Sequence, residues 1–219
     1  QGVSSAASDV YKRQVKLRIK SVQSTMQITK AMELVASSKL RKAKERAETC
    51  RPYFTELHET LKDIARENID FSSVYARESS NPRYCYVAIA GDRGLAGGYN
   101  ANLFKCLEAA AEGKDYVVLP IGKKAVEYFR QRGIECLTDK FAEIADISVA
   151  DCFEIANLLC EEFRKGTFGH IELCYTVFAS MLSQQPEVFS VLPMTDIREE
   201  SGGRAALSLI HISEPTRPY

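Results

Sequence analysis

The chain has 219 residues, of which 45% are hydrophobic and 26% charged, and its 29 Lys and Arg balance 29 Asp and Glu. This composition is that of an ordinary globular protein and excludes wholesale disorder and collagen-like repeats. No apolar run approaches the roughly 18–20 residues of a membrane-spanning helix. The seven Cys are never spaced CxxC and the three His are scattered, so we expect reduced core thiols and no metal site.

The zero net charge hides two regions of opposite sign. Residues 12–67 hold 14 Lys and Arg against 7 Asp and Glu, whereas residues 83–206 hold 13 against 18. A basic region favours an acidic partner, a nucleic acid or an anionic membrane surface. Its most basic stretch, 39–46, lacks the aromatic residues that stack on bases. We therefore interpret this stretch as a solvated helix face or as a face apposed to an acidic protein.

The two ends of the chain are set apart from the rest. Residues 1–14 have no sustained apolar period, and residues 207–219 follow a Gly-Gly pair and carry two Pro. Both resemble translated adaptor sequence. We expect an artefactual or disordered end on each side and leave both out of the fold prediction.

The first predicted element is a long helix over 15–67, a region with no Gly and one Pro. Apolar residues recur in it at alternating steps of four and three, interrupted only by Thr29 and Glu33. A 3.5-residue repeat kept over about seven heptads predicts a left-handed coiled coil. We call these positions the seam: Val15, Ile19, Val22, Met26, Thr29, Glu33, Ala36, Leu40, Ala43, Ala47, Cys50, Phe54, Leu57, Leu61 and Ile64.

A second apolar stripe, at Ile28, Met32 and Val35, predicts a contact besides the coiled-coil mate. The alternative is a helix that is apolar on several sides because it is buried. Pro52 is expected either to kink the helix or to split it. Residues 83–206 offer no second helix of comparable length, so the mate is another chain, a second copy or a segment lost from the C-terminus.

After a polar linker over 68–82, residues 83–206 alternate strands with helices. This order predicts a Rossmann-like α/β domain with a mostly parallel sheet, ending in an antiparallel hairpin. The expected strands are 84–90, 116–121, 134–137, 170–179 and 187–192, and the expected helices are 100–112, 122–132 and 148–165. Asn100 or Asn102 is expected to cap the first of these helices. In the last helix, the core-facing stripe is expected to be Val149, Cys152, Phe153, Ala156, Leu159, Cys160 and Phe163.

The sharpest motif is AGDRGLAGGYN, residues 90–100, between a strand and a helix. Such a turn can cradle phosphate, yet it matches neither GxGxxG nor GxxxxGK[ST]. We favour tight backbone geometry for its glycines, with partner contact and nucleotide binding as alternatives. Asp92 and Arg93 are expected to be exposed at the carboxyl edge of the sheet, where they could cap or bind a neighbour. With no nucleophile beside a base and no metal-ligand spacing, we expect no catalytic, cofactor or metal site.

Four motifs together resemble one family over roughly residues 15–200. The run Arg18–Lys44, RIKSVQSTMQITKAMELVASSKLRKAK, resembles the N-terminal helix of the gamma subunit of the rotary, proton-driven F-type ATP synthase. DRGLAGGYN, residues 92–100, resembles the second signature of that family. IGKKA at 121–125 and SQQPEVFSVLP at 183–193 agree with it in position and type.

The resemblance implies a non-catalytic rotor subunit, the central stalk, present in one copy per complex. It would couple proton-driven rotation of the membrane ring to the conformational cycle of the catalytic beta subunits, and regulate ATPase activity. Its implied partners are the alpha and beta subunits, the epsilon subunit and the c-ring, with no nucleic acid, at the cytoplasmic face of the bacterial cell membrane.

In this family the mate of the long helix is a C-terminal helix, to which residues 207–219 bear no likeness. Signature residues carried over as partner contacts are Ile28, Thr29, Lys30, Met32, Glu33, Asp92, Arg93 and Gly94. The alternative reading is an α/β nucleotide-binding protein with a basic helix that binds nucleic acid or a membrane surface.

Overall fold

The computed structural model describes residues 2–67, 73–144, 147–180 and 183–194, with the backbone alone for 2–8 and 61–67. The chain divides into two compact units, Gln1–Leu61 and Lys62–Tyr219. Each unit is described by itself below. The expected end at 207–219 lies outside the described residues.

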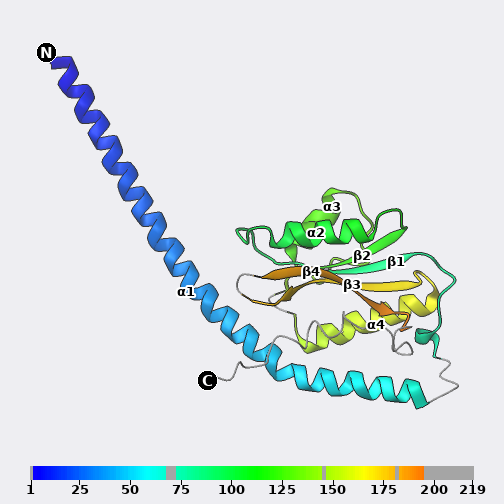
Figure 1. Cartoon of the computed structure of the whole chain (residues 1–219). Coiled ribbons are helices and arrows are strands. Elements are labelled where there is room, and N and C mark those ends of the chain that lie inside the picture. Colours follow the sequence, from blue (N-terminus) through cyan, green and yellow to red (C-terminus); the bar gives the residue numbers. More distant parts are fainter. Residues whose placement is uncertain (1, 68–72, 145–146, 181–182, 195–219) are drawn as a thin grey trace, which may run out of the picture. The chain divides into compact units, whose positions relative to one another are not determined.

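The predicted long helix is confirmed as α1, Gly2–Glu67, 66 residues that continue through Pro52 (Figure 1). It begins before residue 15, where we expected it to start, because elongating a formed helix adds one hydrogen bond per residue and no Gly or Pro interrupts residues 3–14. The predicted split at Pro52 is wrong, since proline removes one backbone donor and a long helix keeps its remaining bonds.

Four strands form one mixed sheet in the order β2-β1-β3-β4. Strand β1, Tyr84–Ile89, pairs in parallel with β2, Tyr116–Ile121, and with β3, His170–Phe178. Strand β4, Gln184–Leu192, is antiparallel to β3. The predicted mostly parallel sheet and its final hairpin are therefore confirmed, although β4 begins three residues earlier than expected.

The predicted strand at 134–137 is wrong. Only one bridge forms, between Cys136 and Val118 of β2. The Val118 N–H donates to the Glu135 carbonyl, and the Val118 carbonyl accepts from the Leu137 N–H. After Leu137 the chain bends away from β2. Two hydrogen bonds are too few for a strand to continue along the sheet edge.

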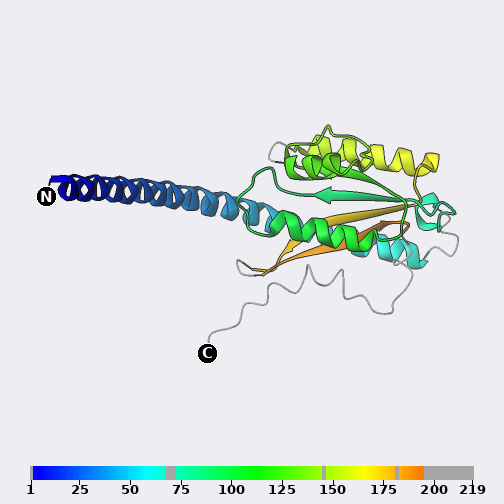
Figure 2. The same cartoon turned by 90° about the horizontal axis from the view of Figure 1, so that it is seen from above.

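Helices cover both faces of the sheet, as expected for parallel strands. Helices α2, Tyr99–Ala110, and α3, Lys123–Gln131, lie on one face, and α4, Val149–Lys165, lies on the other (Figure 1). Figure 2 looks onto the α2–α3 layer, where the ring of Phe104 stacks on that of Tyr128 with centroids 4.0 Å apart. Alternate residues of β1 enter the two cores, Cys85 and Val87 on the α4 side and Tyr86 and Ala88 on the other.

Two predicted details of the helices are wrong. The N-cap of α2 is Gly98, without a side-chain hydrogen bond, because the Asn100 side chain instead accepts from the Gly91 N–H at 2.9 Å. In α4 the buried residues are Ile155 and Phe163. Four residues of the predicted stripe are exposed because α4 has apolar residues on two sides and only one side meets the sheet: Val149, Cys152, Phe153 and Ala156.

The described part of the predicted linker, residues 73–82, packs on the α/β domain. The Tyr75 ring lies 6.0 Å from that of Phe163, and the Tyr75 carbonyl accepts from the Met194 N–H at 2.8 Å. The Asn81 amide donates to the Gly166 carbonyl at 2.6 Å. The Tyr75 ring and the Asn81 amide therefore anchor this part of the linker to α4 and its C-cap residue.

Helix α4 begins with a capping box. The Ser148 hydroxyl accepts from the Asp151 N–H at 3.2 Å, and the Asp151 carboxylate accepts from the Ser148 N–H at 2.8 Å. Replacing Ser148 with alanine should lower the free energy of unfolding of the α/β domain by about 1 kcal/mol at pH 7. Urea unfolding followed by tyrosine fluorescence measures this change.

The same cap should respond to acid. Hydrogen bonds from Ser148 lower the pKa of the Asp151 carboxyl below its usual 3.8. The ionised Asp151 carboxylate stabilises the folded state fully above pH 3.8. This stabilisation is lost as the pH falls through the lowered pKa of the carboxyl. The stability difference between the parent and Ser148→Ala should therefore be constant from pH 7 to about pH 5 and narrow at lower pH. A difference that widens in acid would contradict this account of the cap.

Candidate partner interface

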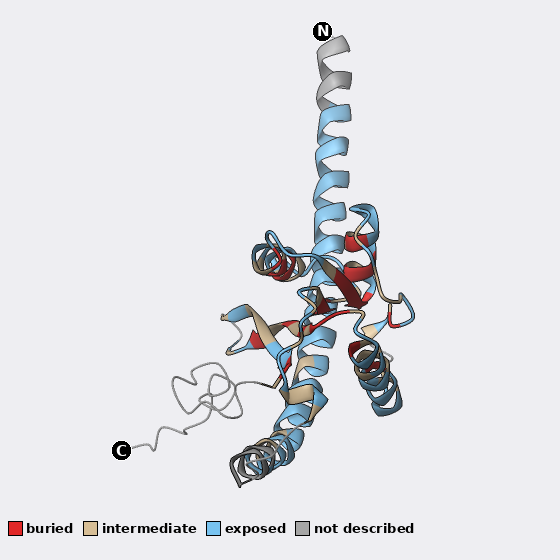
Figure 3. Cartoon of the chain, turned by 90° about the vertical axis from the view of Figure 1, so that its right-hand side faces the viewer, coloured by how far each residue is buried: buried red, intermediate tan, exposed pale blue. Residues whose placement is uncertain are grey.

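The described seam residues of α1 (Figure 3) are solvent-exposed except Leu40, which is half-buried. The side chains of Val22, Met26 and Phe54 are 62%, 64% and 56% exposed. Among residues 9–60, none is buried. Rows of exposed large apolar side chains are rare on soluble proteins and mark interaction surfaces. The seam therefore has the chemistry of an interface.

The second stripe is exposed as well, with Ile28, Met32 and Val35 at 59%, 55% and 57%. These described residues of α1 are therefore not buried within their own unit. Five predicted contact residues, Ile28, Thr29, Lys30, Met32 and Glu33, lie together on two turns of α1. Here α1 offers apolar side chains in more than one direction.

The two polar interruptions of the seam differ in a way that the sequence pattern did not reveal. The Thr29 hydroxyl donates to the Thr25 carbonyl at 2.9 Å, so its donor is satisfied within the helix and its methyl group is free to pack. Glu33 makes no ion pair among the described residues. Only Glu33 therefore brings an unpaired charge into the seam.

The basic stretch 39–46 keeps part of its charge free. Arg41 pairs with Glu45 at 3.7 Å and Lys44 pairs with Glu48 at 3.5 Å, both exposed pairs one helical turn apart. Within the described part of the chain Lys39 and Lys42 have no such partner. Exposed pairs contribute little, on the order of 0–1 kcal/mol, so an acidic surface could engage all five cations of the stretch, Arg46 included.

In the second motif the base of the loop is tied to α3 and to the segment at Ile144. The Asp92 carboxylate accepts from the Lys123 N–H at 3.2 Å and from the Ile144 N–H at 3.0 Å. The Gly91 carbonyl accepts from the Lys124 N–H at 3.1 Å. We expected Asp92 to be exposed, but it is partly buried. Of the two roles predicted for it, capping or binding a neighbour, it has the first, because it accepts from the first N–H of α3.

Beyond this base, residues 93–98 form an exposed tip, as expected for Arg93. Leu95 is 98% exposed and has φ +59°, and Gly97 has φ +57°. The positive φ of Gly97 supports the interpretation that glycine supplies backbone geometry here. Sequence reasoning missed Leu95, whose exposure and backbone conformation carry no pattern in the sequence.

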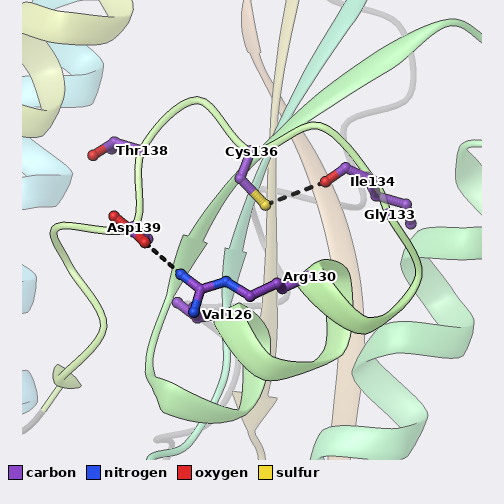
Figure 4. Close-up of a pocket in the computed structure, with 7 residues that line it drawn as sticks. All are labelled: Val126, Arg130, Gly133, Ile134, Cys136, Thr138 and Asp139. Carbon is purple, nitrogen blue, oxygen red and sulfur yellow. Dashed lines mark hydrogen bonds and ion pairs between the residues drawn. The ribbon is translucent and has the colours of Figure 1, made fainter.

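A hollow of about 450 Å³ lies between α3 and residues 133–139, and Figure 4 labels the residues that line it. The Arg130 guanidinium at its rim pairs with Asp139. The Cys136 thiol donates to the Ile134 carbonyl at 3.5 Å, and burial raises its pKa. With its cation paired and its thiol protonated, this hollow offers no reactive group.

The other potentially reactive groups are the cysteine thiols, and two of them lie in the core. Burial raises the pKa of the Cys85 and Cys174 thiols to about 12, so these two are core residues as predicted, whereas Cys50 and Cys152 are exposed. Among the described residues no cluster of three His, Cys, Asp or Glu could hold a metal ion. In the same part of the chain no helix is sufficiently long and apolar to cross a bilayer.

An exposed helix with an apolar seam, joined in sequence to a Rossmann-like domain, defines a class of proteins that present a long helix for association with a partner helix. A family model described as ATP synthase matches residues 12–217. The ATP synthase gamma chain of Ruminococcus albus is 47% identical over 191 residues, which cover 84% of this chain and 66% of that one. The chain belongs to the ATP synthase gamma chain family, and the resemblance of its motifs is confirmed.

Two further similarities complete the comparison. The sodium ion specific ATP synthase gamma chain of Acetobacterium woodii is 35% identical over 83% of this chain and 60% of that one. The central stalk and c-ring structure of the Tetrahymena thermophila mitochondrial ATP synthase has a chain that aligns with a TM-score of 0.53 and 20% identity, covering 76% of this chain and 72% of that chain. This likeness supports the fold. The chain spans about two thirds of the length of the Ruminococcus relative.

Proposed function

We propose that this chain works as the rotating central stalk of an ATP synthase and has no active site of its own. The observation that carries the proposal is the exposed seam of α1, which requires a mate helix. In the proposed assembly the mate is the C-terminal helix of the gamma chain, and the pair turns inside a hexamer of alternating alpha and beta subunits. Family membership favours this function over a nucleotide-binding protein with a nucleic-acid or membrane helix.

Coupling would be mechanical. A coiled coil is a stiff rod, and its rotation would present different side chains to each beta subunit in turn, biasing the state of each catalytic site. The two turns with Ile28, Thr29, Lys30, Met32 and Glu33 would make these contacts. The free cations Lys39 and Lys42 would face acidic partner surfaces through weak, water-screened attractions that guide rotation without stopping it.

The α/β domain would form the foot of the stalk. We propose that it binds the epsilon subunit and the c-ring at the cytoplasmic face of a bacterial membrane, in one copy per complex. Arg93 and Gly94 at the exposed tip would contact a neighbouring subunit, while Asp92 holds the loop in place. We propose protons as the driving ion; the ring selects the ion, and the name of the Acetobacterium relative assigns sodium to that protein.

A substitution in the seam tests the proposal. Val22→Glu should reduce retention by co-expressed alpha and beta chains at least tenfold, because a charge would replace an apolar side chain at the interface with the mate. Quantitative pull-down measures retention, and helicity is checked by circular dichroism. Gln23→Glu adds the same charge one residue away, outside the seam, and should be retained like the parent.

Two results would contradict the stalk function. One is equal retention of Val22→Glu and Gln23→Glu. The other is failure of the parent chain to associate with alpha and beta chains under conditions where both substituted and parent chains are folded.

A further inference from the structure

The charged residues of α1 are sorted by their position relative to the seam. A row of residues lies on each side of the seam, at 16, 23, 30, 37, 44, 51 and 58 and at 18, 25, 32, 39, 46, 53 and 60. We call these the flanking rows. None of their positions carries Asp or Glu, whereas seven carry a cation: Lys16, Arg18, Lys30, Lys39, Lys44, Arg46 and Arg51.

The acidic residues of the same region lie elsewhere on α1. Glu33 lies within the seam, and the others lie on the side of the helix away from it: Glu45, Glu48, Glu56 and Glu59. Among the described residues Lys44 is the one flanking cation with an ion pair, to Glu48 at 3.5 Å. The flanking cations are exposed, except the half-buried Arg51. Both edges of the seam are therefore positively charged and available to a partner.

Resting on the proposed function for the identity of the mate, we propose that the seam accepts a helix with acidic flanking rows and rejects a second copy of itself. Residues that flank a coiled-coil seam lie opposite the flanking rows of the mate and set the choice of partner. Two copies of α1 would bring together only cations and uncharged side chains there, in either orientation and in any register. Acidic rows on the mate turn these repulsions into attractions. In the proposed assembly, the C-terminal helix of the gamma chain would carry the acidic rows.

The seam itself favours a mate helix over a membrane surface. Three of its four residues between 36 and 47 are alanines, and the flanking cations Lys39, Lys44 and Arg46 are concentrated in this region. A stripe of two residues in seven is the narrow seam of a coiled coil, whereas a helix that lies on a membrane buries a wide apolar face. Flanking residues lie at the edge of the paired helices, so Lys39 can also meet the surrounding hexamer proposed above.

Two triple variants with the same net charge test this charge rule. The flank variant carries Lys16→Glu, Lys44→Glu and Arg46→Glu, and the outer variant carries Lys20→Glu, Arg41→Glu and Lys42→Glu. Each variant loses one exposed ion pair of α1, and circular dichroism checks its helicity. Each is mixed with the parent chain at an ionic strength of about 0.01 M and studied by sedimentation equilibrium. The association constant should be at least about tenfold larger for the flank variant, because like charges across the seam become opposite charges.

The parent alone should be monomeric at this ionic strength and should self-associate at about 1 M salt, where the repulsion is screened. Equal association constants for the two variants would overturn the charge rule, and so would self-association of the parent that is strongest at low salt. Binding of the parent to phosphatidylserine vesicles, lost in the flank variant and kept in the outer variant, would assign the rows to a membrane surface and overturn the rule as well. These measurements contain no alpha or beta chain. A parent that fails only in the pull-down therefore overturns the stalk function, while the charge rule holds for another mate.

Discussion

If the chain works as the proposed stalk, Ala36→Pro is expected to abolish coupling between rotation and ATP synthesis in the assembled complex. Proline at this position removes the hydrogen bond from residue 36 to the carbonyl of Met32 and places its ring against that carbonyl, which costs about 3 kcal/mol or more in a helix interior. The surrounding part of α1 is exposed, so no packing within the unit holds the broken turn in place. A rod with a break in its seam cannot pair continuously with a mate or transmit torque.

Proton-driven ATP synthesis in reconstituted vesicles measures the effect, with ATP hydrolysis recorded in parallel to show that the hexamer is intact. The comparison variant neutralises three cations of the basic stretch at once: Lys39→Gln, Arg41→Gln and Lys42→Gln. It should lose much less coupling, because exposed charge contacts are individually weak. Equal coupling by Ala36→Pro and the parent would show that the continuity of α1 is not needed.

Gly122→Ala is expected to have a large effect on the stability of the α/β domain. Gly122 has φ +96°, and a Cβ at this residue would lie 2.2 Å from the Ala90 carbonyl oxygen. Both the strained conformation and the clash with backbone must be relieved by moving β1 and β2 apart at their carboxyl ends. We expect a loss of at least about 3 kcal/mol in the free energy of unfolding.

Substitutions at two other glycines distinguish the cost of a positive φ from the cost of a steric clash at the added Cβ. Gly113 has φ +72° but open space around its Cβ position, and Gly94 has open space without a positive φ. Gly113→Ala should cost about 1 kcal/mol, and Gly94→Ala should be neutral. Urea unfolding followed by tyrosine fluorescence gives the series. If Gly122→Ala unfolds at the same urea concentration as Gly94→Ala, close backbone approach does not limit this residue.

Local patterns in the sequence were sufficient for α1, for four of the five predicted strands and for the parallel character of most of the sheet. The seam at 3.5-residue spacing predicts α1, and the alternation of strands with helices predicts a mostly parallel sheet, because both signals arise from neighbouring residues along one chain. The same patterns placed the Asp92–Asn100 loop at a strand-to-helix turn. The resemblance carried by four separated motifs pointed to the family of the chain.

The tertiary structure alone decided which of several locally possible contacts each residue makes. Periodicity shows that α4 carries apolar stripes, but only packing against the sheet determines that Ile155 and Phe163 are buried while Phe153 is exposed. The Asn100 side chain could cap a helix or hold a loop. It holds the loop, because the Gly91 N–H lies within hydrogen-bonding distance of its side-chain oxygen. The partly buried Asp92 and the exposed Leu95 could not be foreseen for the same reason. Burial and hydrogen bonding depend on residues that are distant in the sequence, and a local pattern contains no information on where those residues lie.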